Sequence, residues 1–290
     1  MERREVLYTL GAWAMTPVAW AAADQPAGSK SEFVMVVMDP LSDRLACDCV
    51  KGYAQRKYDK LGALLQATLE RPVKVVYGDT IASVLREKSD GRADLIIGKY
   101  SVVKFDAAHN KLEVTPVAML TGTDGTTTQT GLVIVPSKDP AQSAKDLKGY
   151  QIILGPEECD EKYAAPMAYL KEQGVSFPDK PLIKPSCTKA AAAILDGKPT
   201  NVAAVISSYA QPLLEGCGTI EKGAVRVVGR THPVPFIGAF ATSSLKGDDL
   251  EIVRETLKTI AEDPEMLKAL ESKKGFVPVE APQELVKKKV

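Results

Sequence analysis

The 290-residue sequence has only two histidines and lacks the short motifs of common hydrolases and nucleotide-dependent enzymes. It contains no Gly-x-Ser-x-Gly turn, no Gly-Lys-Ser/Thr phosphate loop and no His-Glu-x-x-His zinc motif. A cysteine nucleophile needs a nearby base, and neither His109 nor His232 adjoins a cysteine in the sequence. These absences argue against an enzyme, and we expect no catalytic residues.

An excess of charge of one sign is also missing. Lys and Arg total 37, Asp and Glu total 37, and the formal net charge is zero. Nucleic-acid-binding proteins usually carry a basic stripe or patch, and the run Lys287-Lys288-Lys289 is more typical of a solvated tail. We therefore expect no nucleic-acid partner.

The sequence has a single long apolar run, Val6–Trp20, which a glycine and a proline interrupt. The run is too short and too broken to favour a membrane span. It follows Arg3-Arg4 and leads into small residues that offer Ala-x-Ala cleavage sites. We predict that residues 1–23 are an export signal, of the general secretory or the twin-arginine type, and that residues 24–32 are a linker. Cleavage would release a periplasmic protein, whereas a retained signal would act as a membrane anchor.

From residue 33 onward, apolar runs of strand length alternate with helical patterns. Phe33–Met38 precedes a helix at about 54–69, and Val73–Tyr77 precedes a helix at about 80–88. This alternation predicts an α/β protein with mostly parallel sheets and right-handed crossovers. Further strands are expected at 94–98, 113–120, 132–135, 182–184, 203–206, 225–228 and 236–242, and further helices from about 187 to 195, ending near 216, and at 248–261 and 264–270.

The stretch Asp146–Val175 reads as a strand–loop–helix unit. A short apolar strand near Tyr150–Leu154 is followed by a break at Gly155-Pro156 and by a helix that ends at Gly174. In an open α/β sheet such a loop opens into the ligand crevice, and the helix N-terminus presents free N–H groups. We therefore expect ligand binding at residues 156–162.

The same unit resembles the second lobe of type II periplasmic solute-binding proteins. The residues that carry the likeness are Asp146-Leu147-Lys148-Gly149, the strand and loop, and a helix that contains Pro166. The likeness is to the phosphate/phosphite/phosphonate-binding group of ABC transporters. Gly98-Lys99-Tyr100-Ser101 resembles a segment that faces the ligand in this group, and Arg230–Pro235 resembles the return of the chain to the first lobe.

This resemblance implies a two-lobed fold, in which each lobe is a mostly parallel sheet flanked by helices. Lobe 1 would comprise residues 33–121 and 232–290, lobe 2 residues 131–229, and the hinge crossings residues 122–130 and 230–231. The alternative interpretation of the Thr/Gly-rich segment 121–130 is a surface loop within one domain. The resemblance also implies a small ligand, bound as the lobes close, and an ABC permease as partner.

The residues expected to hold the ligand depart from those of the group. Its Ser-Thr-Ser-Gly run, which holds the phosphonate oxygens, aligns with Cys159, Asp160, Glu161 and Lys162. A phosphonate dianion there would meet like charge, at a cost of about 1 kcal/mol or more for each close pair. The acids therefore favour a cation, a metal complex or a zwitterion, and we expect phosphate and methylphosphonate to bind weakly. The alternative is that the acids cap the helix.

The five cysteines allow two interpretations. Cys47, Cys49, Cys159 and Cys187 are expected in loops that face the crevice, and Cys217 away from it. In an oxidising compartment the first interpretation is a Cys159–Cys187 disulfide, with the other two bridged or left as thiols. The second is a metal or redox-cofactor site formed by the four crevice cysteines, in an accessory protein whose partner is a periplasmic oxidoreductase. Only the second interpretation requires a cofactor.

The candidate ligand-binding residues lie in loops at the expected carboxyl ends of strands. They are Asp39, Ser42, Asp43, Arg44, Lys99, Tyr100, Ser101, Glu158, Cys159, Asp160, Ser186, Cys187, Thr188, Ser207 and Ser208.

Overall fold

The structure is a computed structural model that describes residues 31–46, 55–178, 180–196 and 200–279. The predicted export signal, together with Cys47 and Cys49, lies outside these residues. Among the described residues, no helix is long and apolar enough to cross a membrane.

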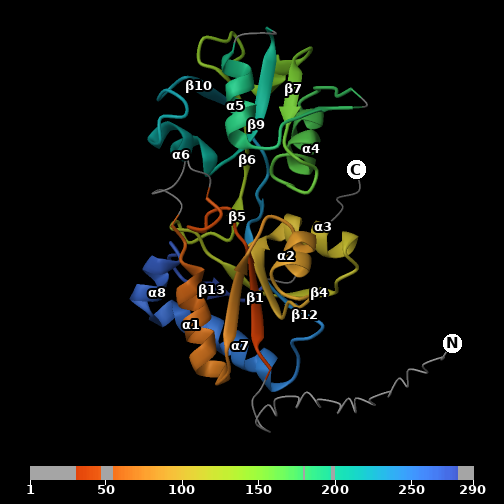
Figure 1. Cartoon of the computed structure of the whole chain (residues 1–290). Helices are drawn as coiled ribbons and strands as arrows, with labels where there is room; N and C mark the ends of the chain where they lie inside the picture. The colour runs from red at the N-terminus through yellow and green to blue at the C-terminus, as the bar shows by residue number, and fades with distance from the viewer. Residues whose placement is uncertain (1–30, 47–54, 179, 197–199, 280–290) are drawn as a thin grey trace, which may run out of the picture. The chain divides into compact units, whose positions relative to one another are not determined.

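The first lobe is built on a six-stranded sheet, drawn in the lower half of Figure 1. Its strand order is β13-β4-β12-β3-β1-β2. The strands are β1 (Phe33–Met38), β2 (Val73–Tyr77), β3 (Leu95–Lys99), β4 (Val114–Leu120), β12 (Ile237–Thr242) and β13 (Phe276–Val277).

The second lobe is built on a five-stranded sheet with the order β10-β6-β9-β7-β8. The strands are β6 (Gly131–Pro136), β7 (Gln151–Leu154), β8 (Leu182–Ile183), β9 (Val202–Ser207) and β10 (Val225–Arg230). Two separate sheets flanked by helices confirm the predicted two-lobed α/β fold.

Each sheet contains one long strand that runs against its neighbours. β1 pairs in parallel with β2 and β3, whereas β12 is antiparallel to both β3 and β4. In the second lobe, β7 is parallel to β8 and β9, and β6 is antiparallel to β9 and β10. β12 and β6 are the strands that the chain enters directly from the other lobe, so they start at the end where β3 and β9 finish. The other long strands of each sheet share one direction, as the alternating pattern predicted.

Helices cover both faces of each sheet, which explains why the central strands are apolar throughout. Phe33, Met35 and Val37 pack with one face of the first lobe, and Val34 and Val36 with the other. The helices are α1 (Tyr58–Leu69), α2 (Ile81–Glu87), α3 (Tyr100–His109), α7 (Asp248–Thr259) and α8 (Pro264–Ala269) in the first lobe, and α4 (Ala164–Glu172), α5 (Cys187–Leu195) and α6 (Ala210–Gly216) in the second, with 3-10 turns η1 (Ala144–Leu147) and η2 (Ile260–Glu262).

Two helices differ from the expectation. α1 begins at Tyr58, four residues after the predicted start at Ala54, and α3 was not predicted. α3 follows β3 without a loop, because Lys99 ends the strand and Tyr100 begins the helix. No turn residue marks this boundary, so the sequence pattern contains little sign of it.

Two short strands connect the lobes. β5 (Thr128–Gln129) and β11 (Val234–Pro235) pair antiparallel, with Val234 opposite Gln129 and Pro235 opposite Thr128. Both lie between the two sheets in the chain, where Figure 1 shows the crossing. Part of the predicted flexible segment 121–130 is therefore a hydrogen-bonded ribbon.

Gly131, the first residue of β6, brings this strand against the loop between β7 and α4. A Cβ atom at Gly131 would lie 2.0 Å from the carbonyl oxygen of Glu161. No side chain fits in this space without movement of the backbone. Glycine at this position therefore fixes how closely the loop sits on the second sheet.

We expect Gly131→Ala to lower the free energy of unfolding by about 1–3 kcal/mol, because the loop must move away from β6. Urea denaturation measures this loss. The control is Gly218→Ala, a position with open space around its Cβ but a φ of +74°, where only the left-handed backbone penalty of about 1–2 kcal/mol applies. The substitution should also move the loop that contains Glu161, so NMR signals of this loop that stay unchanged in Gly131→Ala would contradict the prediction.

Candidate ligand-binding cleft

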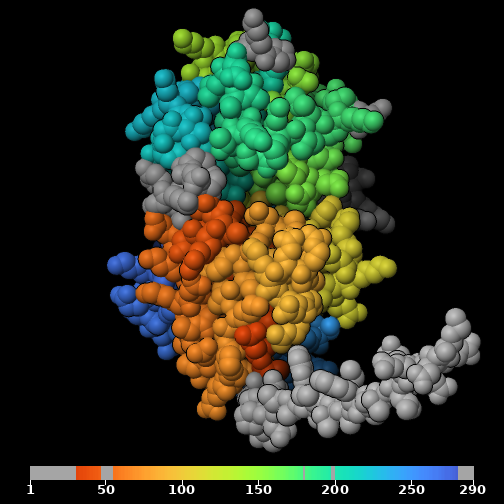
Figure 2. Space-filling view, viewed as in Figure 1, coloured from red at the N-terminus to blue at the C-terminus, as the bar shows by residue number. Residues whose placement is uncertain are grey.

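Three connections bring polar side chains together between the lobes. They follow β3 in the first lobe and β7 and β9 in the second, and all three begin at carboxyl ends of strands. Figure 2 shows the first lobe, red to yellow, against the green second lobe on the side that faces the viewer. The side chains in this region already contact one another, so the structure shows a closed arrangement.

A buried ion pair joins the two lobes. Lys99, at the end of β3, is 5% exposed, and Glu161, in the β7–α4 loop, is 0% exposed. The Nζ of Lys99 donates to Oε1 of Glu161, and the hydroxyl of Ser207 donates to the same oxygen at 2.7 Å. The other carboxylate oxygen, Oε2, is buried and has no hydrogen-bond partner among the described residues.

The electrostatics keep both groups charged. Burial alone would raise the pKa of Glu161, but the ammonium groups of Lys99 and Lys162 and the two hydrogen bonds hold it below its usual value. Burial alone would lower the pKa of Lys99, but the Glu161 carboxylate raises it above its usual value. Each partner therefore stabilises the charged form of the other.

Lys162 adds a second buried ammonium group. Its side chain is 7% exposed and packs over Gly155, where a Cβ atom would lie 2.5 Å from the Cβ of Lys162. The thiols of Cys159 and Cys187 are close enough to act on its charge. No carboxylate lies within 4.0 Å of its ammonium group in the part of the chain that the structure describes. The region thus contains two buried cations and one buried anion.

Ser101, in the first turn of α3, makes a second polar contact between the lobes. Its hydroxyl donates to the carbonyl oxygen of Glu158 at 2.8 Å and accepts the backbone N–H of Asp160 at 3.2 Å. Asp160 itself is partly buried, and this burial raises the pKa of its carboxyl group. One serine of the first lobe therefore holds the backbone of the β7–α4 loop.

Several N–H groups before α4, which were expected to be free, are paired within the loop. Lys162 and Tyr163 donate their backbone N–H groups to the carbonyl of Cys159 at 2.9 Å each, and Ala165 donates to that of Asp160. The alternative of capping by acids is also wrong, because α4 has no side-chain cap. The loop winds into its own turns, and these satisfy part of the donors that an exposed helix start would present.

Asp39 was predicted to bind ligand, but it belongs to an internal network. Its carboxylate accepts from the guanidinium of Arg56 at 2.8 Å and from the hydroxyl of Tyr58 at 2.5 Å. Asp39 and Tyr58 are 0% exposed and Arg56 is 3% exposed. A buried charge needs such partners, so Asp39 here fixes the start of α1 against β1.

Three neighbours of Asp39 also lie apart from the ion pair. Ser42 is buried and its hydroxyl accepts the backbone N–H of Leu45 at 3.3 Å. Arg44 is exposed and pairs with Asp59 at 2.9 Å. Asp43 has one buried carboxylate oxygen without a partner among the described residues. Among the described residues, none of these three contacts Lys99 or Glu161 through a hydrogen bond or an ion pair.

The remaining residues that were predicted to bind ligand lie in different parts of the structure. Tyr100 packs on Phe240 with ring centroids 5.1 Å apart. Ser186 caps α5 by accepting the N–H of Lys189 at 3.2 Å, and the partly buried Thr188 lies in the first turn of that helix. Ser208 pairs its backbone with Thr130, at the crossing. Of this group, Ser208 and Tyr100 border cavities, which are described below.

The cysteine predictions are partly wrong. Cys159, Cys187 and Cys217 are free thiols, so the predicted Cys159–Cys187 disulfide is absent. Cys187 instead accepts the backbone N–H of Ser207 at 3.4 Å, and burial raises the pKa of the Cys159 thiol. Within the described residues no group of three His, Cys, Asp or Glu side chains is placed to hold a metal ion. The residues that the structure describes give no support to the metal or redox interpretation, and Cys47 and Cys49, which it also requires, lie outside them.

A cavity of about 480 Å³ lies beside the crossing strands, between the lobes. Tyr209 from the second lobe stacks on Phe236, with ring centroids 5.3 Å apart. The guanidinium carbon of Arg56 also lies over the Phe236 ring, 5.6 Å from its centroid. Two buried polar atoms near this cavity, Nε of Arg56 and Oε1 of Gln129, have no hydrogen-bond partner in the described part. Sequence reasoning missed these residues because a helix start, a crossing and two aromatic residues carry no binding motif.

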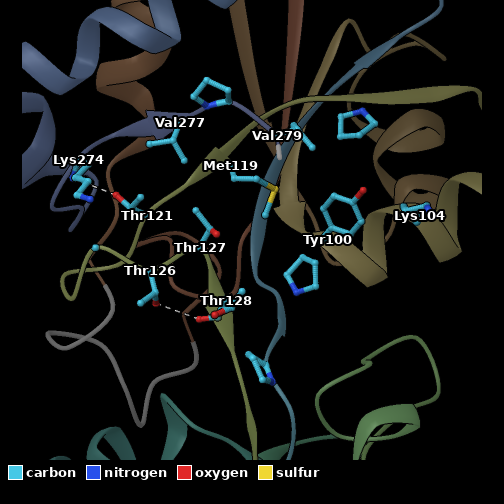
Figure 3. Close-up of a pocket in the computed structure, with 15 residues that line it drawn as sticks. Tyr100, Lys104, Met119, Thr121, Thr126, Thr127, Thr128, Lys274, Val277 and Val279 are labelled. Atoms are coloured by element: carbon cyan, nitrogen blue, oxygen red, sulfur yellow. Dashed lines mark hydrogen bonds between the residues drawn. The ribbon is translucent and has the colours of Figure 1, made fainter. Parts of the chain in front are cut away.

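A larger cavity, about 950 Å³, lies on the first lobe and the crossings (Figure 3). Tyr100, Met119 and Thr127 line it together with Lys274 and Val277. The second lobe contributes no lining residue between 131 and 230. This cavity therefore does not gather the loops that meet at Lys99 and Glu161.

The sheets, the double crossing and the polar contacts between lobes define a two-lobed binding protein. A family model described as "ABC transporter, phosphonate, periplasmic substrate-binding protein" matches residues 52–284. The chain belongs to this family, which confirms the resemblance read from the sequence and places the protein outside the cytoplasm as a solute-binding component of ABC transport.

Solved structures share the fold at low sequence identity. XAC2383 from Xanthomonas citri bound to ATP is 19% identical, with 87% of this chain and 92% of that chain covered and a TM-score of 0.63. PhnD1 from Prochlorococcus marinus in complex with methylphosphonate is 13% identical, with 87% and 94% covered and a TM-score of 0.63. A binding protein component of an ABC phosphonate transporter from Pseudomonas aeruginosa is 13% identical, with 86% and 81% covered and a TM-score of 0.62. A sequence search of curated proteins finds no match.

We expect Asp39→Asn to lower the free energy of unfolding by about 3–5 kcal/mol, because it leaves the Arg56 charge buried without its partner. The matched control is Asp59→Asn, which breaks the exposed pair with Arg44 and should leave stability nearly unchanged. Chemical denaturation measures both. Equal losses in the two variants would contradict the structural role of Asp39.

The ion pair also predicts a dependence of stability on pH. The pKa of Glu161 is lower in the folded state than in the unfolded state, so its charge stabilises the fold. This stabilisation is present above the unfolded pKa of about 4.3 and is lost as pH falls through the folded pKa. Because the folded pKa of Lys99 is raised, its contribution is present below about 10.4 and is lost as pH rises through the folded value. The stability difference between the wild type and Glu161→Gln should therefore shrink below about pH 4. Urea unfolding between neutral pH and pH 3 tests this, and a constant difference would contradict it.

Proposed function

We propose that this chain is the receptor of an ABC importer, which captures a small solute between its lobes and presents it to a membrane permease. The observation that carries this proposal is the convergence of polar groups from both lobes, the buried Lys99 and the partly buried Ser101 on one side and the buried Glu161 on the other. Side chains that are exposed when the lobes part become buried when they meet. Such a region can hold a ligand that only the closed form encloses.

Closure would proceed by bending at the two crossings. We place the hinge at residues 122–130 and 230–231, with lobe 1 at residues 33–121 and 232–290 and lobe 2 at residues 131–229. The β5–β11 ribbon keeps the crossings together, so opening would rotate one lobe while each sheet stays intact. Opening would separate Lys99 from Glu161 and Ser101 from the β7–α4 loop. An export signal at residues 1–23, cleaved after transport, would place the receptor in the periplasm.

The cleft does not suit a free phosphonate dianion. Methylphosphonate is bound in one structure of similar fold and ATP in another, and this chain places the carboxylates of Asp160 and Glu161 in the β7–α4 loop. Each close like-charge pair weakens binding by about 1 kcal/mol or more. We therefore propose a solute of lower negative charge, including a zwitterion. Calorimetry that gave sub-micromolar affinity for phosphate or methylphosphonate would contradict this part of the proposal.

The experiment for the receptor function is native mass spectrometry of protein purified from its own periplasm, followed by small-angle scattering before and after the bound solute is removed. We expect a bound small molecule, and a larger radius of gyration once it is gone. Lys99→Met should reduce retention of the solute at least tenfold, and Lys246→Met, an exposed lysine of the same lobe, should not. If no solute is found and no compound of a metabolite library changes the scattering curve, the receptor proposal fails.

A further inference from the structure

The Glu161 carboxylate has the contacts that an anionic ligand group would make. One oxygen accepts from an ammonium group of the first lobe and from a hydroxyl of the second, and the side chain is 0% exposed. The second ammonium group, that of Lys162, is also close enough to act on its charge. A carboxylate fixed to the protein thus lies where buried donors from both lobes converge.

We infer that Glu161 is a built-in counter-ion, which occupies the anion position of the cleft and limits the charge of any ligand that the closed form accepts. This inference rests on the proposed function and names the residue that sets its specificity. Lys99, Lys162 and Ser207 would otherwise form an anion site. With Glu161 in place, part of that site is filled without a ligand.

The charge balance gives the limit. Lys99 and Lys162 contribute two buried positive charges and Glu161 one buried negative charge. A ligand with one net negative charge brings this group to neutrality, whereas a dianion leaves an uncompensated negative charge, which is costly when buried. Asp160 is only partly buried, and its carboxylate would make a dianion still less favourable. The ligand should therefore carry at most one net negative charge.

The unpartnered oxygen of Glu161 adds a second requirement. Oε2 is buried and accepts no hydrogen bond from the described residues. Leaving such an oxygen unsatisfied is unfavourable, and a ligand donor would remove this cost. A hydroxyl, amide or ammonium group meets this need. The chemical class that fits is a small monoanion or zwitterion with a hydrogen-bond donor.

The test compares two probes that share a shape and differ by one charge: methanesulfonate, a monoanion, and methylphosphonate, a dianion at pH 8.5. Calorimetry on the wild-type protein should give methanesulfonate equal or tighter binding. Glu161→Gln removes the fixed negative charge, so we expect methylphosphonate to bind at least tenfold tighter than to the wild type and to become the preferred probe. The matched control is Glu157→Gln, which removes an exposed charge from the same loop and should leave the order unchanged.

Two further measurements keep the inference testable if Glu161→Gln is unstable. The relative affinity of the wild-type protein for the two probes can be measured without any variant. A wild type that binds methylphosphonate more tightly than methanesulfonate overturns the inference. The paired variant Lys99→Gln/Glu161→Gln removes one charge of each sign, and it should lose the gain in methylphosphonate affinity. If folded Glu161→Gln shows no gain for methylphosphonate, the inference is wrong, although the receptor function stands if the wild type still closes on a periplasmic solute. A gain without any solute for the wild type would support the inference and reject the receptor function.

Discussion

The ion pair between Lys99 and Glu161 is the contact on which the closed arrangement depends. It joins the end of β3 to the β7–α4 loop, and both side chains are buried. A buried ion pair adds little net stability, because desolvation of both charges offsets their attraction. When the pair separates, each charge must be solvated by water. Under the proposed closure, the pair would alternate between two states: paired in a closed, dry cleft, or hydrated in an open one.

The scaffold holds these groups in place from both sides. In the first lobe, Lys99 lies at the junction of β3 and α3, and Ser101, two residues later, holds the opposite loop. In the second lobe, Gly131 allows that loop to rest directly on β6, and Ser207 at the end of β9 donates to the same carboxylate as Lys99. The site therefore depends on the ends of elements whose cores are apolar, and we propose that motion is confined to the crossings.

Membership of the phosphonate-binding family and an acidic cleft are compatible, because a fold does not fix a ligand. The strand order and crossings that permit closure belong to the backbone and to the cores. We propose that a few residues in one loop set the ligand charge, and here that loop has Asp160 and Glu161. Substitutions in such a loop leave the hydrophobic cores of both lobes intact, so a receptor of this family can differ from its relatives in the solute it accepts.

The sequence by itself determined the α/β class and most strand positions, because apolar runs such as Phe33–Met38 must be buried whatever surrounds them. The two-lobed fold was implied by the resemblance to periplasmic solute-binding proteins. The sequence also pointed to the β7–α4 loop. Only the tertiary structure decided which polar groups meet: it placed Asp39 in an internal network with Arg56, kept the thiols of Cys159 and Cys187 free, and paired Lys99 with Glu161 across 62 positions of sequence. Local patterns record burial and turns, whereas partners of buried charges are set by how distant loops are brought together.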